Sequence, residues 1–459
     1  MVRIISRNNP TSYLDVLSRA LSATAIVFIL LVSGSGSALA RTWYIKADGS
    51  GDAPTIQDGV DAASDGDVIL VGAGDYSATS TIDIGGTATT VCVSIGKNIK
   101  LVSENGSQTT TIGNAAANIV IYVHDVGQNV EINGFQIHTT FSGYFCVANA
   151  VAPTAPLPSF YRRGIRCQNA SPIIKNNIVE NGIAIELLAS PAAVLQNEVR
   201  LASYGIVCSD GSDASLGQNV IHTCAFAIAT WSSSPTIVDN EMYDGCTGVQ
   251  CLVAGSPTVT RNVIHDYENY GVVAEVPLTL EENRVLRTWI AAELSNIVGT
   301  CEVRGNICVY QSTAFNLSDD DRATIVIETN TICSVGLAIA CQRGSSPTIA
   351  RNIIFGASTG IWCALSSFPV ISCNDVMATR RYVGDCGDQT GTNGNISIDP
   401  QFCGVPNSDN YALQSDSPCA PGHHPDGSNC GRIGAQDVAC GPLATVAKTW
   451  GAIKAMYRR

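Results

Sequence analysis

The segment SPTVTRNVI, residues 256–264, carries the pattern that decides the fold. Similar segments occur at residues 171–179, 234–240 and 346–354, each with Ser-Pro ahead of short β-branched runs that flank an asparagine. Runs of this kind favour strands, and Asn is a non-glycine residue that tolerates the left-handed backbone of a tight corner. The segment therefore predicts two short strands that meet at a corner occupied by the asparagine.

This asparagine recurs through the middle of the chain with a mean spacing of about 22 residues. A fixed period of this length is typical of a solenoid. Side-chain amides stacked from coil to coil both donate and accept, so we expect them to form a hydrogen-bonded ladder. The ten positions are Asn177, Asn197, Asn219, Asn240, Asn262, Asn283, Asn306, Asn330, Asn352 and Asn374.

A glycine followed by an apolar residue opens a third strand after most of these corners. Three short strands per turn predict a triangular coil, and a long stack of such coils predicts an all-β protein. The pairs are Gly182-Ile183, Gly205-Ile206, Gly248-Val249, Gly271-Val272, Gly336-Leu337 and Gly360-Ile361.

The first forty residues are typical of a signal peptide. Three arginines precede an apolar run at residues 25–32, and small residues lead to Ala38-Leu39-Ala40. We expect cleavage after Ala40 and a secreted or cell-surface protein, the alternative being a retained N-terminal anchor. The whole chain has a formal charge of −13, and loss of this leader, with three Arg and one Asp, lowers it to −15.

That acidic charge excludes certain partners. It repels the phosphates of nucleic acids, so we expect no DNA or RNA partner. It also opposes a polyanionic glycan unless a basic cleft or bound Ca²⁺ intervenes.

The remaining sequence divides into four regions. Residues 41–140 are predicted to form an N-terminal cap and the first coils, with a short amphipathic helix across residues 55–63, and residues 141–380 the repeats with the asparagine ladder. Residues 148–159, rich in proline, are predicted to be a loop. Residues 381–440 form a Cys-rich C-terminal closure, and residues 441–459 a basic amphipathic tail. The tail suits an anionic membrane surface or an export partner, and a cap or frayed end is the alternative.

The 18 cysteines form two populations. Cys167, Cys208, Cys251 and Cys363 lie three residues after a coil glycine or its equivalent, which predicts that they point into the core as small hydrophobic residues. Five others crowd the C-terminal closure, where we expect disulfides, and their odd number means that at least one pairs elsewhere or stays free. They are Cys386, Cys403, Cys419, Cys430 and Cys440. No cysteine and histidine spacing indicates zinc.

Both ends of the repeat region carry a family resemblance. The opening motifs include WYI at 43–45, TIQ at 55–57 and GDVI at 66–69, and the closing motifs include IDPQF at 398–402 and SPC at 417–419. Together with the asparagine repeat they resemble exported bacterial right-handed parallel β-helix proteins of the pectin-lyase-like superfamily. The resemblance implies a single right-handed parallel β-helix with an N-terminal helix cap. The Asn-Thr-Asp, Gly-His-Gly and Arg-Ile-Lys motifs of its polygalacturonase-like hydrolases do not occur here.

Two glutamates are candidate catalytic residues. Glu275 lies four residues after Gly271, and Glu293 has the same offset if Trp289 occupies the glycine position of the next coil. Carboxylates on adjacent coils, about 4.8 Å apart, can serve as acid and nucleophile or base, or can bind Ca²⁺. The alternative is two solvated surface side chains.

Four further residues are candidate binding residues. Arg166 and Glu186 are predicted on the same outer face, and Trp231 and Trp362 are predicted as exposed aromatic side chains on which sugar rings stack. Packing beneath a loop is the alternative for both tryptophans.

From these features we expect an exported monomer that recognises polysaccharide along its parallel sheet and requires no cofactor. One alternative is a polysaccharide lyase or glycosidase acting on a uronic-acid or neutral glycan. Another is a structural or adhesive surface protein.

Overall fold

The computed structural model describes residues 40–139, 161–404 and 410–441. The chain divides into two compact units, residues 1–41 and 42–459, and nearly all described residues belong to the second. Three predicted segments lie wholly or almost wholly outside the described residues: the signal peptide except Ala40, the loop at 148–159, and the C-terminal tail except Gly441. Within the described part of the chain, no helix is long and apolar enough to cross a membrane.

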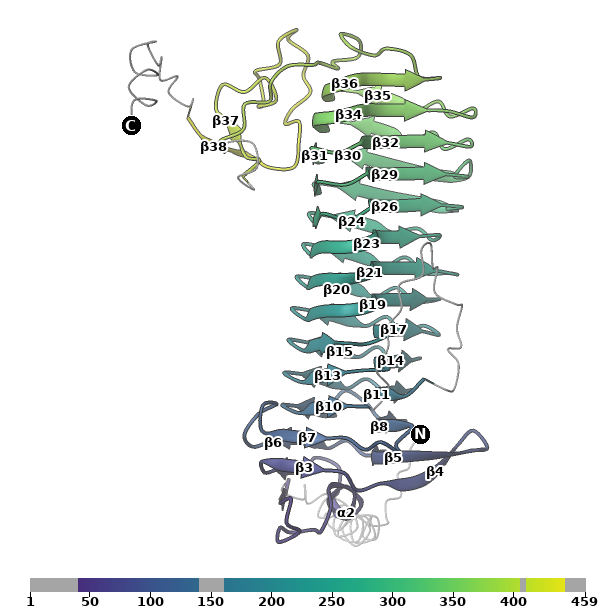
Figure 1. Ribbon diagram of the computed structural model, residues 1–459, viewed down its shortest axis with the longest axis vertical. Coiled ribbons are helices and arrows are strands. Elements are labelled where there is room, and N and C mark those ends of the chain that lie inside the picture. The colour runs from purple at the N-terminus through teal and green to yellow at the C-terminus, as the bar shows by residue number, and fades with distance from the viewer. Residues whose placement is uncertain (1–39, 140–160, 405–409, 442–459) are drawn as a thin grey trace, which may run out of the picture. The chain divides into compact units, whose positions relative to one another are not determined.

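Residues 42–139 and 161–384 wind into a right-handed parallel β-helix whose strands stack in register (Figure 1). The first column of the stack is a 14-stranded parallel sheet. Its strands are β1 (Thr42–Ile45), β2 (Val68–Val71), β6 (Lys100–Ser103), β9 (Glu131–Asn133), β12 (Ile173–Lys175), β15 (Ala193–Leu195), β18 (Ser215–Gly217), β20 (Thr236–Val238), β22 (Thr258–Thr260), β24 (Thr279–Glu281), β27 (Gly299–Arg304), β30 (Ala323–Glu328), β33 (Thr348–Ala350) and β35 (Val370–Ser372).

The second and third columns belong to one 22-stranded sheet, because five long strands run through both. The long strands are β19 (Val220–Trp231), β21 (Glu241–Leu252), β23 (Val263–Ala274), β34 (Ile353–Cys363) and β36 (Asp375–Gly384). The second column also contains β3 (Gly74–Tyr76), β7 (Thr110–Ile112), β10 (Gln136–His138), β13 (Ile178–Glu180), β16 (Glu198–Arg200), β25 (Arg284–Leu286), β28 (Ile307–Val309) and β31 (Thr331–Cys333). The third also contains β5 (Thr87–Ile95), β8 (Ile119–His124), β11 (Arg163–Gln168), β14 (Ile183–Leu188), β17 (Tyr204–Ser209), β26 (Ile290–Ser295), β29 (Thr313–Ser318) and β32 (Leu337–Gln342). The prediction of three strands per coil is confirmed.

The predicted asparagine ladder is present and fully buried. Asn219 shows how each rung works: its Oδ1 accepts from the backbone N and the Nδ2 of Asn197, both at 3.0 Å. Its own Nδ2 donates to Val194 O and to Asn240 Oδ1, each at 2.9 Å. The same amide-to-amide bond repeats from Asn177 through all ten predicted positions and ends at Asn395. Every rung thus ties its coil to the next.

The prediction that the ladder asparagine adopts the left-handed conformation is wrong. The residue before it does, as at Gln218, Arg261 and Thr329, each with φ of 55°. Asparagine is selected at the ladder because its buried amide satisfies backbone groups on both sides, while the exposed corner position accepts varied residues at some conformational cost.

The glycines that open the third strand are required by close coil contacts. A Cβ on Gly205 would lie 2.4 Å from Ala227 O, and one on Gly248 would lie 2.5 Å from Gly271 O. No side chain fits at those distances, so the glycine-apolar pairs mark positions where the backbones of adjacent coils are in close contact.

A second ladder stabilises the opposite corner with serines. Ser212 N donates to Ser233 Oγ at 3.1 Å, and Ser190 N donates to Ser212 Oγ at 2.9 Å. Asp320 occupies the equivalent place further along, where its Oδ1 accepts from Ile297 N at 2.8 Å. Because the side chain is buried, the pKa of Asp320 rises to about 6.

The predicted helix near the N-terminus is confirmed as α2 (Ile56–Ala62). Thr55 caps it by accepting from Asp58 N, and its apolar side chains Ile56 and Val60 are buried in the core of the coils. A hairpin follows: β4 (Ser80–Ile84) pairs antiparallel with β5 and interrupts the otherwise parallel stack.

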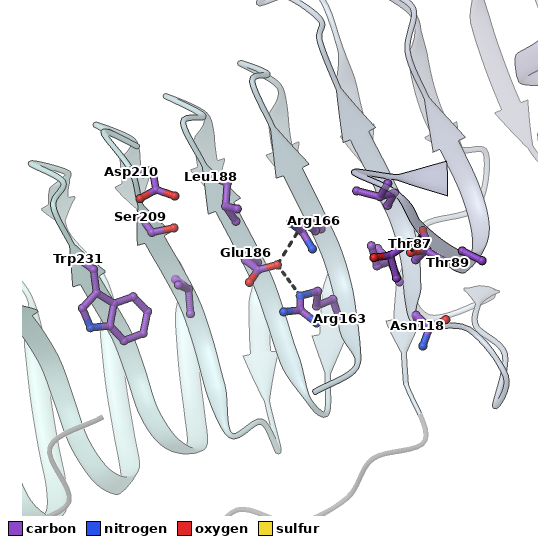
Figure 2. Close-up of a pocket in the computed structure, with 14 residues that line it drawn as sticks. Thr87, Thr89, Asn118, Arg163, Arg166, Glu186, Leu188, Ser209, Asp210 and Trp231 are labelled. Atoms are coloured by element: carbon purple, nitrogen blue, oxygen red, sulfur yellow. Dashed lines mark hydrogen bonds and ion pairs between the residues drawn. The ribbon is translucent and has the colours of Figure 1, made fainter. Parts of the chain in front are cut away.

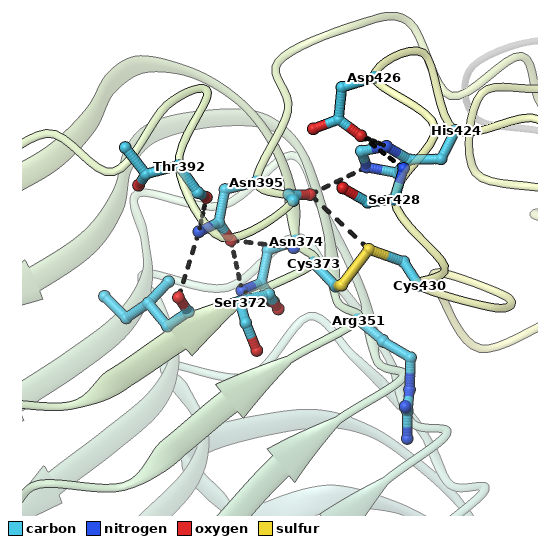
Figure 3. Close-up of a disulfide and its surroundings, with 12 residues drawn as sticks. Arg351, Ser372, Cys373, Asn374, Thr392, Asn395, His424, Asp426, Ser428 and Cys430 are labelled. Carbon is cyan, nitrogen blue, oxygen red and sulfur yellow. Dashed lines mark hydrogen bonds and ion pairs between the residues drawn. A yellow bond between two sulfur atoms is a disulfide. The ribbon is translucent and has the colours of Figure 1, made fainter.

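The C-terminal segment folds back along the second column. Tyr411, Phe402 and Ala435 pack on the outer side chains of β25, β28, β31 and β34, and β37 (Leu413–Gln414) pairs with β38 (Val438–Cys440). Figure 3 shows the disulfide Cys373–Cys430, which joins this segment to a coil corner beside the end of the asparagine ladder.

The cysteines follow most of the prediction. Cys167, Cys208 and Cys251 are buried free thiols in the core, whereas the equally buried Cys363 is bonded to Cys386. Within the C-terminal region Cys403 pairs with Cys440 and Cys419 stays free.

Replacing a ladder residue should destabilise the coils far more than replacing its neighbour. Asn219→Ala leaves buried donors and acceptors unpaired, and we expect a loss of about 3 kcal/mol in the free energy of unfolding. Urea denaturation measures it. Gln218→Gly is the matched control, because glycine relieves the left-handed backbone, and it should be neutral or stabilising by up to about 1 kcal/mol. Equal losses in the two variants would contradict the ladder's role.

The buried Asp320 makes stability depend on pH. Its pKa is raised in the folded state, so the native protein holds a proton that the unfolded chain loses, and stability falls as pH rises from about 4 to about 6. Asp320→Asn removes this loss and should be more stable than wild type by about 2 to 3 kcal/mol at pH 7, and nearly equal at pH 4. Urea titrations at both values test this. The exposed Asp321, which is not among the groups that shift the pKa of Asp320, provides the control Asp321→Asn, which should behave as wild type.

Candidate functional site

A cavity of about 290 Å³ opens on the outer face of the third column, at the tip of the β4–β5 hairpin (Figure 2). The hairpin forms one side, and strands β8, β11, β14, β17 and β19 form the floor. Its lining residues are Ile84, Thr87, Ala88, Thr89, Asn118, Ile119, Arg163, Arg166, Glu186, Leu188, Val207, Ser209, Asp210 and Trp231.

The strand register places an arginine and a glutamate side by side on this floor. Arg166 pairs with Tyr122 on one neighbouring strand and with Glu186 on the other. Alternate residues of a strand face the same side, and Ile165 and Cys167 fill the core, so this row faces outward.

Two arginines share the one buried carboxylate. Arg163 Nε donates to Glu186 Oε2 at 2.5 Å, and only 8% and 6% of the two side chains are exposed. Arg163 also donates from Nη1 to Tyr161 O at 2.7 Å. These bonds satisfy both charges, which a buried pair requires.

Arg166 is held less tightly. Its Nε lies 3.4 Å from the same Glu186 oxygen, near enough for an ion pair, but the buried Nε makes no hydrogen bond within the described residues. The side chain is 20% exposed and lines the cavity. Arg166 therefore presents a guanidinium whose hydrogen-bonding capacity is not used up.

The structure brings three of the six predicted site residues together: Arg166, Glu186 and Trp231 all line this cavity. The predicted exposure of Trp231 is wrong, because only 1% of it is exposed. Its ring packs in an outer apolar cluster with Tyr204 and Phe226 among others, while one part reaches the cavity. Long strand β19 carries it onto a face that other side chains cover, so a sugar cannot stack on an open ring.

The predicted juxtaposition of Glu275 and Glu293 is wrong. Val273 is the residue opposite Glu293, and Glu275 is exposed beyond the end of β23. The register aligns Ala291 with Gly271, so Ala291 fills the glycine position assigned to Trp289 and the offset shifts by two. Catalytic roles for the two glutamates remain predictions.

Glu293 has an environment of its own on the same outward row. Burial raises the pKa of its carboxyl, which accepts from Asn316 Nδ2 at 2.8 Å. Glu293 lies five strands beyond Glu186, and the partly exposed Trp362 lies eight, which is roughly 40 Å from the cavity floor. Neither residue can share a small ligand with Arg166.

Sequence reasoning missed Arg163 and the hairpin residues of the cavity. On the nearest strands the register position of Arg163 is filled by large apolar or aromatic residues, Ile119, Ile183, Tyr204 and Phe226. An arginine among these neighbours is a signal that an alignment of the coils would have revealed. Thr87, Thr89 and Asn118 lie outside the repeat, and no sequence pattern marked them as site residues.

No group of three or more His, Cys, Asp or Glu side chains is placed to hold a metal ion within the described ranges. Ca²⁺ binding by Glu275 and Glu293 therefore gains no support and stays a prediction.

Comparison with known proteins identifies the fold. Residues 163–292 match the family model described as "Right handed beta helix region", and the resemblance to right-handed parallel β-helix proteins is confirmed. A search of curated protein sequences gives no match.

Solved structures of similar fold include enzymes and an adhesin. The catalytic unit of a thermostable α-1,3-glucanase from Streptomyces thermodiastaticus is 14% identical with a TM-score of 0.53, over 72% of this chain and 67% of that one. The A-module of a mannuronan C-5 epimerase from Azotobacter vinelandii is 13% identical with a TM-score of 0.49, over 75% and 94%. PfbA, a surface adhesin of Streptococcus pneumoniae, is 14% identical with a TM-score of 0.40, over 70% and 87%. At 14% identity the similarity to the α-1,3-glucanase establishes the fold alone.

Proposed function

We propose that this chain is an exported β-helix protein that recognises an acidic polysaccharide, with the sugar carboxylate bound by Arg166 in the cavity beside the β4–β5 hairpin. The observation that carries the proposal is the guanidinium of Arg166, which lines the cavity with 20% of its side chain exposed and lies 3.4 Å from Glu186, against 2.5 Å for Arg163. Arginine pairs with carboxylates through strong charge-assisted bonds.

The charges around the cavity support an acidic ligand. Glu186 is the close partner of Arg163 at 2.5 Å, which leaves Arg166 the more available cation. A negatively charged glycan needs such a basic point on a protein of this net charge. Asp210, exposed at the rim, is suited to accept hydrogen bonds from sugar hydroxyls.

Neutral polar groups supply the remaining contacts. Thr87 and Thr89 on the hairpin, Asn118 beside it and Ser209 across the cavity offer side-chain donors and acceptors. Eight of the fourteen lining residues are polar or charged and six are apolar, so the cavity offers both hydrogen-bonding groups and apolar surface to a sugar.

Export is part of the proposal. The N-terminal sequence has the features of a signal peptide, and disulfides such as Cys373–Cys430 and Cys403–Cys440 persist in oxidising compartments. The basic C-terminal tail would supply attachment to an anionic surface or to export machinery.

Catalysis is a second candidate function, and Glu293 is the residue that favours it. Burial raises the pKa of its carboxyl, as suits a general acid. The pKa of the nearby Tyr270 phenol is also raised, first by burial and second by the negative charge of Glu293. The fold also occurs in glycan-cleaving enzymes. A purely structural or adhesive rod would neither bind glycan at the cavity nor turn it over.

Removing the charge of Arg166 should weaken binding of acidic oligosaccharides. Arg166→Met keeps an unbranched side chain, so we expect a loss of about 10- to 100-fold in affinity for oligogalacturonate or oligomannuronate by calorimetric titration, from one charge-assisted contact. Neutral glucans should bind weakly and equally to both proteins.

Arg261→Met is the control, because Arg261 pairs with Asp239 at an exposed corner outside the cavity. Binding that is equal in wild type and Arg166→Met would place recognition elsewhere, and no binding by wild type to any glycan would overturn the proposal.

If Glu293 is catalytic, Glu293→Gln should abolish turnover while leaving binding at Arg166 intact. The measurement follows unsaturated products and new reducing ends with uronic and neutral glycans, with and without Ca²⁺. A loss of at least about 100-fold is expected for a general acid. Turnover that survives in Glu293→Gln, or is absent in wild type, removes Glu293 from the account.

A further inference from the structure

A second cavity, of about 380 Å³, lies between α2, β4 and the ends of β5 and β8. It is bounded by Gln57, Val60, Asp61, Ser80, Ile82, Ser94, Gly96, Lys97 and His124. Ser94 Oγ lies 3.4 Å from His124 Nε2, and His124 Nδ1 lies 3.2 Å from Asp125 Oδ2. A serine, a histidine and an aspartate are thus connected in line, with the serine and the histidine at the cavity wall.

The aspartate fixes which ring nitrogen carries the proton. The hydrogen bond to His124, followed by one from Asn169 Nδ2, lowers the pKa of Asp125, so its carboxyl is ionised and can only accept. His124 Nδ1 must then be the donor, which leaves Nε2 free to accept the proton of Ser94. This is the arrangement in which an imidazole acts as a general base on a hydroxyl.

Several contacts hold the histidine and serine in place. The His124 ring stacks on Tyr122 with centroids 4.9 Å apart and an interplanar angle of 19°. Gly96 leaves room for it, since a Cβ there would lie 2.9 Å from the ring. Gln57 binds the backbone of Ser94 on both sides, accepting from its N at 2.7 Å and donating to its O at 3.3 Å.

A cation is fixed at the rim of the same cavity. Lys97 Nζ donates to three carbonyls at the C-terminal end of α2, those of Val60, Asp61 and Ala63. These three bonds use all the N–H groups of Lys97, which therefore contributes only its positive charge to the cavity.

We propose that Ser94, His124 and Asp125 form a nucleophilic site for small acyl esters. Ser94 Oγ attacks the ester carbonyl carbon and forms a bond to it while Nε2 takes the hydroxyl proton. The ester C–O bond breaks, and the leaving alkoxide takes that proton from Nε2. Water then gives a proton to Nε2 and attacks the acyl carbon. The bond from that carbon to Ser94 Oγ breaks, Oγ takes the proton from Nε2, and the carboxylic acid leaves. Asp125 orients the ring throughout. The proposal does not depend on glycan recognition.

The test is labelling of the full chain by a fluorophosphonate probe, located by peptide mapping, together with hydrolysis of p-nitrophenyl acetate. We expect label on Ser94 of wild type. Ser94→Ala and His124→Gln should each lower hydrolysis by at least about 100-fold. Asp125→Asn should give a smaller loss, because the aspartate is 71% exposed and water partly replaces it.

Ser80→Ala is the matched control, since Ser80 lines the same cavity without contacting the imidazole, and it should retain full labelling and hydrolysis. Circular dichroism confirms that each variant is folded. Wild type without label on Ser94, or a Ser94→Ala variant that hydrolyses the ester as wild type does, would overturn the proposal. The assay contains no polysaccharide, so its failure is distinct from that of the proposed function.

Discussion

The hydrogen bond between one buried asparagine amide and the next is the interaction on which this structure depends. Each Oδ1 accepts two bonds from the preceding coil, and each Nδ2 donates both backward to a backbone carbonyl and forward to the next amide. A buried corner carries backbone groups that no strand satisfies, and the ladder satisfies them with one residue type. Because the bonds form only when successive corners stand in line, the ladder also fixes the register of the three columns.

The register in turn decides which side chains meet on the surface. A coil adds about 4.8 Å to the stack, so residues from distant parts of the chain become neighbours in a row. One outward row contains Ser94, Tyr122, Arg166 and Glu186. Both cavities adjoin this row where the antiparallel β4–β5 hairpin breaks the regular repeat. Flat stacked strands offer little concavity, and the hairpin supplies the walls that a ligand site requires.

The repeat itself was predictable, and the sites were not. The spacing of the asparagines and glycines was sufficient to predict the coil, its three strands and the cysteines that point inward, because buried corners accept few residue types. Offsets counted from a glycine failed at Glu293, since the spacing of the asparagines varies from 20 to 24 residues and Ala291 replaces the glycine. The exposure of Trp231 was not predictable from its coil alone, because Tyr204 and Phe226 pack with it in an apolar cluster on the outer face. Ser94 and His124 stand thirty residues apart in the sequence, and no local motif marks their contact.

The central claim is that the strand register places a cationic side chain, Arg166, where it can bind an acidic sugar on a protein of negative net charge. A crystal structure of the mature protein soaked with an oligogalacturonate or oligomannuronate tests it most directly. The account predicts a sugar carboxylate within hydrogen-bonding distance of the Arg166 guanidinium, in contact with the β4–β5 hairpin. A sugar bound on another face, or lying over Glu293 with the cavity empty, would contradict it.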